Sequence, residues 1–153
     1  MTTALETFFT QLALAEQDFT FIKSLSVPAD HCPVNPPAVA PTSAQLPIFV
    51  NTLSDFVPTP DGQHRQDRES TDYTIMALLL ISADRQPASF ATIKPLVGPC
   101  IAGFRRARET QFNFSVSKVE AATGKAGFYA YMDGLYAGIM FKFNVQVDED
   151  KTQ

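Results

Sequence analysis

The stretch Leu135-Tyr136-Ala137-Gly138-Ile139-Met140-Phe141-Lys142-Phe143-Asn144-Val145-Gln146-Val147 decides the fold. From Ile139 to Val147 every odd-numbered residue is apolar, and the even-numbered residues between them are polar except for Met140. A period of two is typical of a strand with one buried face and one face in water. Phe and Val favour strands, and neither Pro nor Gly interrupts the run after Gly138. We therefore predict a strand at or near the centre of an antiparallel sheet.

A second predicted strand, 73–81, is the most apolar segment of the chain. After Thr74, apolar residues occupy both its odd-numbered and its even-numbered positions, so both faces of the strand are apolar. Such a strand needs cover on both faces. In a small domain helices usually cover one face, so the other must be covered by more of the same chain, such as its Pro-rich segment, or by another molecule. This requirement is the first indication of oligomerisation.

Two amphipathic helices are predicted. Thr3 and Glu6 have the spacing of a capping box, and apolar residues at helical spacing follow them, so we expect a helix over 3–17. Ser89 is the expected N-cap of a second helix over 89–108, which Pro95 and Pro99 should kink or break in two. The basic residues at its end suit the helix dipole and solubility, or else pair with acidic loops of a partner.

Shorter elements complete the pattern. Alternating apolar residues predict strands, and Gly-rich or Asp-Gly sequences predict turns. The class is therefore α+β: an antiparallel or mixed β-sheet with two helices packed on one face and a long Pro-rich arm. The further strands are expected at 18–25, 46–53, 111–119 and 128–132, and the turns at 123–127 and 133–134.

The chain of 153 residues is expected to form a single domain over 1–153. The Pro-rich arm, 27–45, should be a long non-helical connection, because proline removes donors and favours extended neighbours. It either lies along a neighbouring subunit, wraps its own domain, or presents a PxxP-type motif to a partner. The polar segment 55–70 is expected to protrude as a loop, and the acidic tail, 148–153, to fray.

Composition excludes several classes of protein. The net charge is −4, so no basic excess points to nucleic acid as a general partner. The apolar run 75–81 is far too short to span a bilayer, and the first residues lack the pattern of a signal peptide, so no membrane role is expected. Cys32 and Cys100 are interpreted as free thiols in a reducing compartment, hence in a cytoplasm.

No catalytic, cofactor-binding or metal-binding constellation is visible in the sequence. His31 beside Cys32, and His64 in a charged loop, lack the further ligands that a metal site needs. Cys100 is expected on the apolar face of the second helix as a buried, inert thiol. Nucleophile-elbow, P-loop and dinucleotide-binding motifs are absent. Acidic residues of the polar loop alternate with Arg65 and Arg68, which is typical of a solvated surface. These observations predict a protein that is not an enzyme and needs no cofactor.

The order of parts resembles the tail terminators and related neck proteins of tailed bacteriophages. A short amphipathic helix comes first, and a strand containing Leu46-Pro47 and Val50 follows an extended loop. An apolar strand then leads into a helix, and a terminal strand runs from Tyr131 through Asp133-Gly134-Leu135-Tyr136 to Val147. The resemblance covers most of the chain in layout. The Pro-rich arm and the prolines of the second helix depart from the family pattern.

The resemblance implies a non-catalytic structural protein of the virion, assembled in the host cytoplasm. Such proteins form rings, usually hexamers, that cap the tail tube and join it to the head connector, with DNA passing through without specific binding. The strand 73–81 and the arm would then make subunit contacts, and the polar loop would reach the tube or the connector. The candidate interface residues are Pro33, Pro36, Pro37, Arg65, Arg68, Met76, Leu78, Leu80, Arg105 and Arg106.

Three alternatives remain at this point. Within the same class, the chain could be another neck or connector protein, or a tail tube subunit. From other classes, it could be a small enzyme with an unrecognised site or a monomeric binding module.

Overall fold

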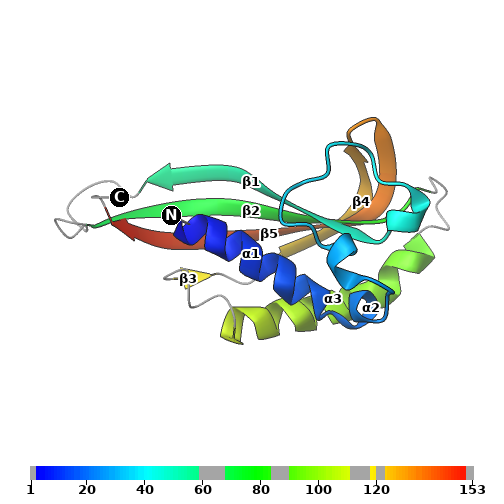
Figure 1. The fold of residues 1–153 in the computed structure, drawn as a ribbon, viewed down its shortest axis with the longest axis horizontal. Helices are drawn as coiled ribbons and strands as arrows, with labels where there is room; N and C mark the ends of the chain where they lie inside the picture. Colours follow the sequence, from blue (N-terminus) through cyan, green and yellow to red (C-terminus); the bar gives the residue numbers. More distant parts are fainter. Residues whose placement is uncertain (1–2, 59–67, 84–89, 111–117, 120–122, 151–153) are drawn as a thin grey trace.

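The structure, a computed structural model, describes residues 3–58, 68–83, 90–110, 118–119 and 123–150. It has the predicted α+β architecture, with an antiparallel sheet and helices gathered on one of its faces (Figure 1). The helices are α1 (Ala4–Gln17), α2 (Thr20–Lys23) and α3 (Phe90–Thr110). The strands are β1 (Ile48–Pro58), β2 (Arg68–Ser82), β3 (Lys118–Val119), β4 (Thr123–Tyr131) and β5 (Gly134–Asp150).

The predicted central position of the terminal strand is confirmed. The sheet order is β1-β2-β5-β3, and β4 also pairs with β5, beyond the stretch that β3 occupies. Strand β5 is antiparallel to β2 along almost its whole length, from Ala137 opposite Ser82 to Asp150 opposite Arg68. β1 forms one edge of the sheet, because among the described strands it pairs with β2 alone.

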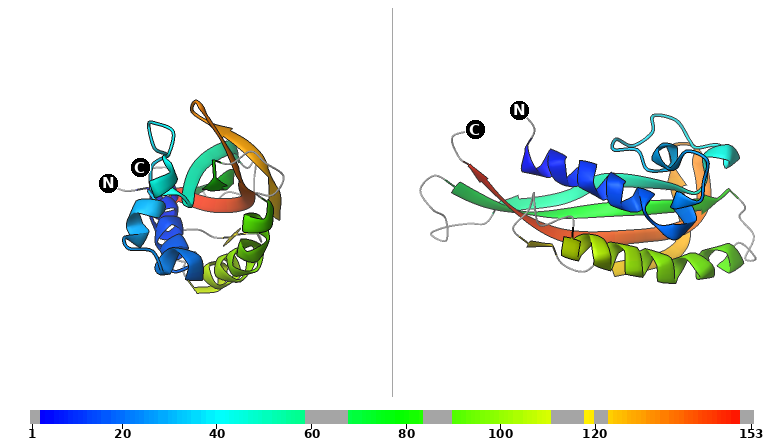
Figure 2. Two further views of the ribbon diagram at one scale, coloured as in Figure 1. Left: turned by 90° about the vertical axis from the view of Figure 1, so that its right-hand side faces the viewer. Right: turned by 60° about the horizontal axis from the view of Figure 1, so that its bottom comes forward.

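The main core lies between the sheet and the helices. The odd-numbered residues of β5 from Ala137 to Val147 point into it, as the period of two predicted, and Phe141, Phe143 and Val145 are all nearly inaccessible. Phe104 of α3 packs on this row, with ring centroids 4.9 Å from those of both Phe141 and Phe143. Figure 2 shows α1 and α3 side by side on the same face of the sheet.

The first helix begins as predicted. The Thr3 side chain accepts a hydrogen bond from the backbone N–H of Glu6, at 3.1 Å, and so caps the first turn of α1. Phe8 and Leu12 of this helix are fully buried in the main core.

The second helix is continuous from Phe90 to Thr110, so of the two effects expected of its prolines, a kink or a break, the break does not occur. Both Pro95 and Pro99 lie inside α3. Each deprives the carbonyl four residues earlier of its donor, and those carbonyls belong to Ala91 and Pro95, which are both exposed. Water can therefore satisfy them, and the buried face with Ile93 and Cys100 holds the helix against the sheet. The expected cap Ser89 lies outside the described residues.

The predicted strand at 18–25 was also wrong. Thr20–Lys23 form the short helix α2, and the N–H groups of Ile22 and Lys23 both donate to the carbonyl of Phe19, at 2.9 and 2.8 Å. Phe19 and Ile22, three residues apart, are the buried pair, whereas Phe21 is only half-buried. A spacing of three is helical, so the alternation of Phe19 with Phe21 was misleading.

Three boundaries differ from the predictions because backbone pairing extends through polar sequence. Residues 123–127 belong to β4 rather than to a turn, and the actual turn lies at Met132–Asp133, where Met132 has φ 54°. The expected protruding loop begins and ends in strands, since β1 reaches Pro58 and β2 starts at Arg68. Residues 148–150 of the tail continue β5 opposite 68–70. The hydrogen bonds between strands join backbone groups and need no apolar side chain. Strands predicted from apolar alternation alone are therefore too short.

The strand predicted at 128–132 forms the second half of β4, and the strand at 46–53 starts two residues late in β1, directly after Pro47. Most of the strand expected at 111–119 lies outside the described residues, and only β3 is seen. The arm is not entirely non-helical, because 3-10 turns form at Pro28–His31 and Ser43–Gln45.

Candidate functional site

The sheet face opposite the helices, here called the second face, carries the apolar side chains that the sequence predicted to need cover. Ile75, Ala77 and Leu79 of β2 point into the main core and are fully buried. Met76 and Leu78 point the other way and are half-buried, whereas Leu80 on the same face is fully buried. The need for cover is therefore met at one end of β2 and only partly met in its middle.

The chain itself covers the Leu80 end of the second face. A second apolar cluster forms there, and partly buried side chains of the arm and of β4 pack on it. Figure 1 shows the backbone of β4 and of the arm at this end of the sheet. Its buried members are Ile48, Val50, Leu80 and Tyr136, and its partly buried neighbours are Ala40, Leu46, Leu78, Tyr129 and Tyr131.

Two tyrosines hold the arm in this position. The Tyr136 hydroxyl donates to the carbonyl of Pro41 at 2.8 Å, and the Tyr131 hydroxyl donates to the carbonyl of Pro37. His31 Nδ1 lies 2.9 Å from the carbonyl of Gln45 and 2.8 Å from that of Pro47, and since carbonyls only accept, this nitrogen carries the proton. Of the alternatives considered for the arm, the structure shows it wrapping its own domain.

The other end of the second face is polar and open. Lys142 and Asn144 of β5 are exposed, and the Thr74 hydroxyl donates to the Asn144 side-chain oxygen at 3.3 Å. Met76 lies at the boundary, because its cross-strand neighbours are Thr52 of β1 and Lys142 of β5. The second face thus changes from buried and apolar to exposed and polar along β2.

The residues predicted for an interface do not form one surface. Met76, Leu78 and Leu80 share the second face with Pro37, whereas Arg105 and Arg106 are exposed on α3, on the helix side of the sheet. Pro33 is half-buried and Pro36 is exposed, both in the arm. Arg68 is the first residue of β2, and Arg65 lies outside the described residues.

A buried carboxyl group that the sequence analysis did not single out lies on the inner face of α1. Glu16 is fully buried, and its Oε1 accepts a hydrogen bond at 2.8 Å from Nδ2 of Asn51 on β1, which is itself 2% exposed. Among the described residues, neither Glu16 Oε2 nor Asn51 Oδ1 has a hydrogen-bond partner. Burial raises the pKa of Glu16 well above that of an ordinary carboxyl, and the hydrogen bond from Asn51 offsets only part of this shift.

The signal for this group was present in the sequence. Glu16 follows Phe8 and Leu12 at spacings of four, so it continues the buried stripe of α1 rather than its wet face. The apolar pattern was recognised, but the charged residue in phase with it was not.

Both cysteines are free thiols, as predicted, and both are buried, which was predicted for Cys100 alone. Burial raises the pKa of Cys100 to about 12, and the nearby charge of Glu16 adds to the shift. The pKa of Cys32 rises for the same two reasons. Neither thiol has the lowered pKa of a catalytic nucleophile.

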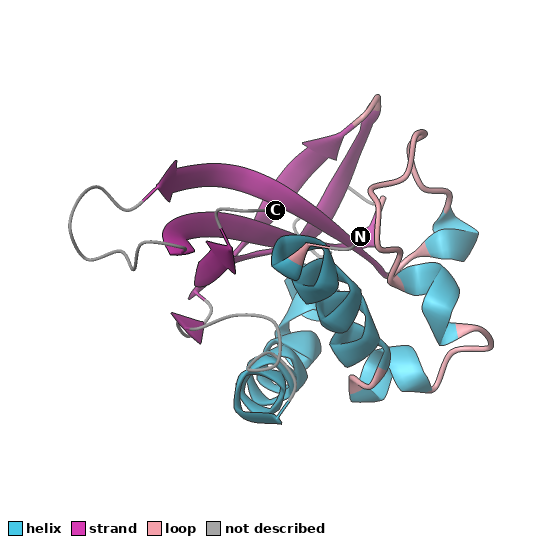
Figure 3. Ribbon diagram, turned by 60° about the vertical axis from the view of Figure 1, so that its left-hand side comes forward, coloured by secondary structure: helices cyan, strands magenta, loops and turns pink. Residues whose placement is uncertain are grey.

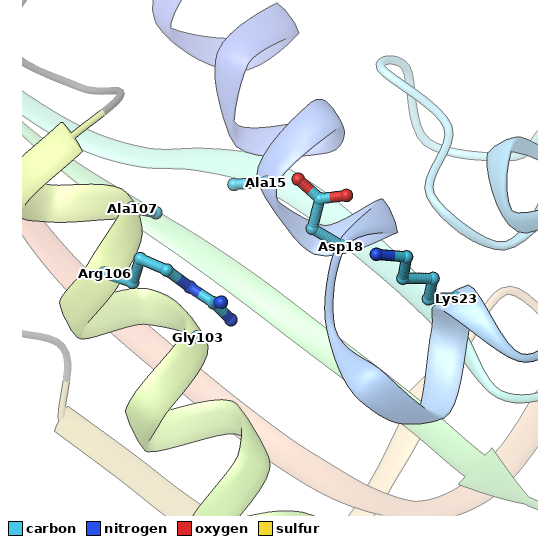
Figure 4. A pocket seen from close by; sticks show the side chains of 6 residues that line it. All are labelled: Ala15, Asp18, Lys23, Gly103, Arg106 and Ala107. Carbon is cyan, nitrogen blue, oxygen red and sulfur yellow. The ribbon is translucent and has the colours of Figure 1, made fainter.

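A small polar pocket of about 170 Å³ lies between the end of α1, α2 and α3. Figure 4 shows the Arg106 guanidinium pointing from α3 toward the gap in which Asp18 and Lys23 face each other. Two cations and one carboxylate leave it with one positive charge, and its remaining lining residues, Ala15, Gly103 and Ala107, offer no nucleophile or general base. Within the described ranges no group of three or more His, Cys, Asp and Glu side chains could hold a metal ion.

The comparisons with known proteins supply no identity: no family model matches the chain, and no curated protein matches it. Among the helices that the structure describes, none combines the length and the hydropathy needed to cross a bilayer.

Proposed function

We propose that the protein is a structural, self-assembling subunit, and more narrowly the ring-forming tail terminator of a tailed bacteriophage. The observation that carries self-assembly is the half-covered second face, where Met76 and Leu78 stay partly exposed beside Leu80. The narrower identity rests on the order of helix, extended loop, apolar strand, helix and terminal strand that the sequence shares with that family.

A neighbouring subunit would remove the remaining apolar area of the second face from water. Complete burial of a Met or Leu side chain contributes about 1.5–3 kcal/mol relative to full exposure, so these half-buried residues would supply part of that. A stable interface needs about 1,000 Å² or more, which the two side chains cannot supply alone. The polar end of the face, with Lys142 and Asn144, would form the hydrated rim.

In this proposal the subunit forms a ring with copies of itself, most simply a hexamer. The ring binds the tail tube on one side and the head connector on the other, and becomes part of the virion after assembly in the host cytoplasm. DNA passes through the ring without specific contacts, and the net charge of −4 suits a channel that does not hold phosphates. Another neck ring or a tail tube subunit is the alternative within the same class.

Assembly tests the proposal directly. We expect the purified protein to elute as an oligomer in size-exclusion chromatography with light scattering, and to form rings by negative-stain microscopy when the tail-tube protein of the same virus is added. A strictly monomeric protein at high concentration, with no ring even in the presence of the tube protein, would contradict the proposal.

Met76→Glu tests the surface. Glu at this position faces Lys142 across the β2–β5 pair, so the subunit should stay folded, whereas a buried charge should prevent assembly. Leu14→Glu is the matched control, because Leu14 is 54% exposed on α1, on the other side of the sheet. Loss of assembly in the control alone, or in neither variant, would place the interface elsewhere.

A further inference from the structure

A groove of about 660 Å³ runs along the outer edge of β1. One wall is α1, the other is the arm, and the floor is the edge of the strand, an arrangement visible in Figure 3 as a helix and a loop flanking the outermost strand. The lining residues are Glu6, Phe9, Thr10, Val34, Asn35, Pro36, Asn51, Thr52 and Leu53.

The floor of the groove offers an unused strand edge. In the described part of the chain β1 pairs with β2 only, and the outer side of Asn51–Leu53 has no strand partner. A β-bulge follows between Leu53 and Asp55 and limits the regular edge to about these residues. An edge of this kind presents backbone N–H and C=O groups to an incoming extended segment.

The walls indicate what such a segment would carry. Phe9 is half-buried, and Val34 and Leu53 are each 40% exposed, which is high for apolar residues lining a hollow. Glu6 is the only charged residue of the lining, and it is exposed. The groove is therefore complementary to apolar side chains and to one positive charge.

The back of the groove is rigidly built. Asn51 is buried and bonded to Glu16 of α1 by the 2.8 Å hydrogen bond described above, which ties the floor to the helical wall. This bond fixes β1 relative to α1, so the floor and the helical wall of the groove keep their relative position.

We propose that this groove binds an extended segment of another protein, with apolar side chains and a Lys or Arg, which adds to β1 as an additional strand. Its backbone pairs with Asn51–Leu53, its apolar side chains contact Phe9 and Val34, and its basic residue lies near Glu6. The groove is a different surface from the second face. The proposal that it binds a partner therefore does not depend on the proposed self-assembly.

Two synthetic peptides test the proposal: acetyl-Thr-Val-Val-Lys-Thr-amide and the same peptide with Glu in place of Lys. In an added strand the first Val and the Lys point to the α1 wall with Phe9 and Glu6, and the second Val points to the arm wall with Val34. Amide chemical shifts of the full chain are followed by NMR during titration. We expect the Lys peptide to shift residues of α1, the arm and β1 that line the groove, and to bind more tightly than the Glu peptide. An exposed charge pair corresponds to a preference on the order of two- to fivefold.

Variants define the contacts. Glu6→Lys should reverse the preference between the two peptides, whereas Asp30→Lys, an exposed acid of the arm outside the groove, should leave it unchanged. Val34→Asp should abolish binding of the Lys peptide without unfolding the protein, because Val34 is exposed. Thermal unfolding followed by circular dichroism checks that each variant is folded, since Lys in the first turn of α1 weakens that helix somewhat.

Several results would overturn the proposal. Shifts that spread over the surface, equal binding of both peptides to wild type and Glu6→Lys, or binding that survives Val34→Asp would each show that the groove is not the site. Groove residues that are inaccessible to the peptide in the wild-type oligomer, but accessible in the Met76→Glu monomer, would show that a second copy covers the groove instead. If the protein binds the peptide but never forms rings, the result would support the proposed groove site and contradict only the proposed assembly.

Discussion

Glu16 shows how a single residue couples the stability of the fold to pH. Its carboxyl sits in the core with one hydrogen bond from Asn51 and with buried thiols of Cys32 and Cys100 near enough to interact with its charge. Burial raises its pKa in the folded state, so the folded protein binds a proton that the unfolded chain releases near its ordinary pKa of 4.5. The contribution to stability is therefore fully present below that ordinary pKa and is lost as pH rises toward the folded-state pKa.

Glu16→Gln should remove this pH dependence. The amide keeps the shape and the contact with Asn51 but needs no proton, so the variant should be more stable than wild type at neutral pH. In wild type each pH unit between the two pKa values costs about 1.4 kcal/mol. Urea unfolding at several pH values measures the slope, and Glu6→Gln, at an exposed position of the same helix, is the control. Equal slopes in wild type and Glu16→Gln would mean that the carboxyl does not titrate in this way.

Gly138 is a second position where a single residue limits the packing, because the sheet leaves no room there for a Cβ atom. A Cβ at this site would lie 2.1 Å from the backbone oxygen of Leu79, and backbone cannot move aside as a side chain could. Gly98 offers the matched comparison, because a Cβ there meets no atom within 4 Å and the residue lies inside α3.

The two glycine substitutions should have opposite signs. Gly138→Ala should destabilise the protein by about 1–3 kcal/mol through overpacking. Gly98→Ala should stabilise it by about 0.5–1 kcal/mol, because alanine is the better helix former. The free energy of unfolding in urea measures both, and a stabilised Gly138→Ala would show that β5 and β2 are not as close at this point as described.

At the scale of elements, the β4–β5 hairpin acts as the clamp for the arm. Tyr131 and Tyr136 lie at its turn end and reach carbonyls of Pro37 and Pro41, more than ninety residues earlier in the chain. The arm therefore keeps its place through contacts that form only when the hairpin has formed. Proline stiffens the arm itself, so few contacts suffice to hold it.

Tyr136→Phe should loosen the arm. The change leaves the ring in the second apolar cluster but removes the donor to Pro41, which leaves a buried carbonyl unpaired and costs about 1–3 kcal/mol. Limited proteolysis should then cut within 27–45 faster than in wild type. Tyr129→Phe is the control, because its hydroxyl bonds within the β4–β5 hairpin, where it donates to the carbonyl of Lys125. Equal cleavage in both variants would contradict the role of the clamp.

At the scale of the whole molecule, periodicity predicted the parts in which side chains decide the structure. The alternation of β5, the two-sided apolar character of β2 and the capped stripe of α1 were all confirmed. The α+β class followed from them. The inert Cys100 was also predictable, since it lies in phase with the apolar face of α3.

What the sequence could not predict depends on contacts between distant parts of the chain. The ends of β2 and β5 are polar and are held by pairing with each other, so neither shows a pattern by itself. The segment at 18–25 became a helix because Phe19 and Ile22 pack between α3 and the sheet. The arm lies on its own domain through bonds from two tyrosine hydroxyls of the β4–β5 hairpin, and no local pattern in the arm reveals these distant partners.

The position of β5 also determines when the sheet can form during synthesis. Every other described strand precedes it in the chain, yet it is the strand to which β2, β3 and β4 all pair. Until β5 leaves the ribosome, the β1–β2 hairpin has no partner on its inner side, and the most apolar strand of the chain is exposed to water and to other nascent chains. The sheet can therefore form only after β5 has been synthesised, and until then the nascent chain should depend on chaperones.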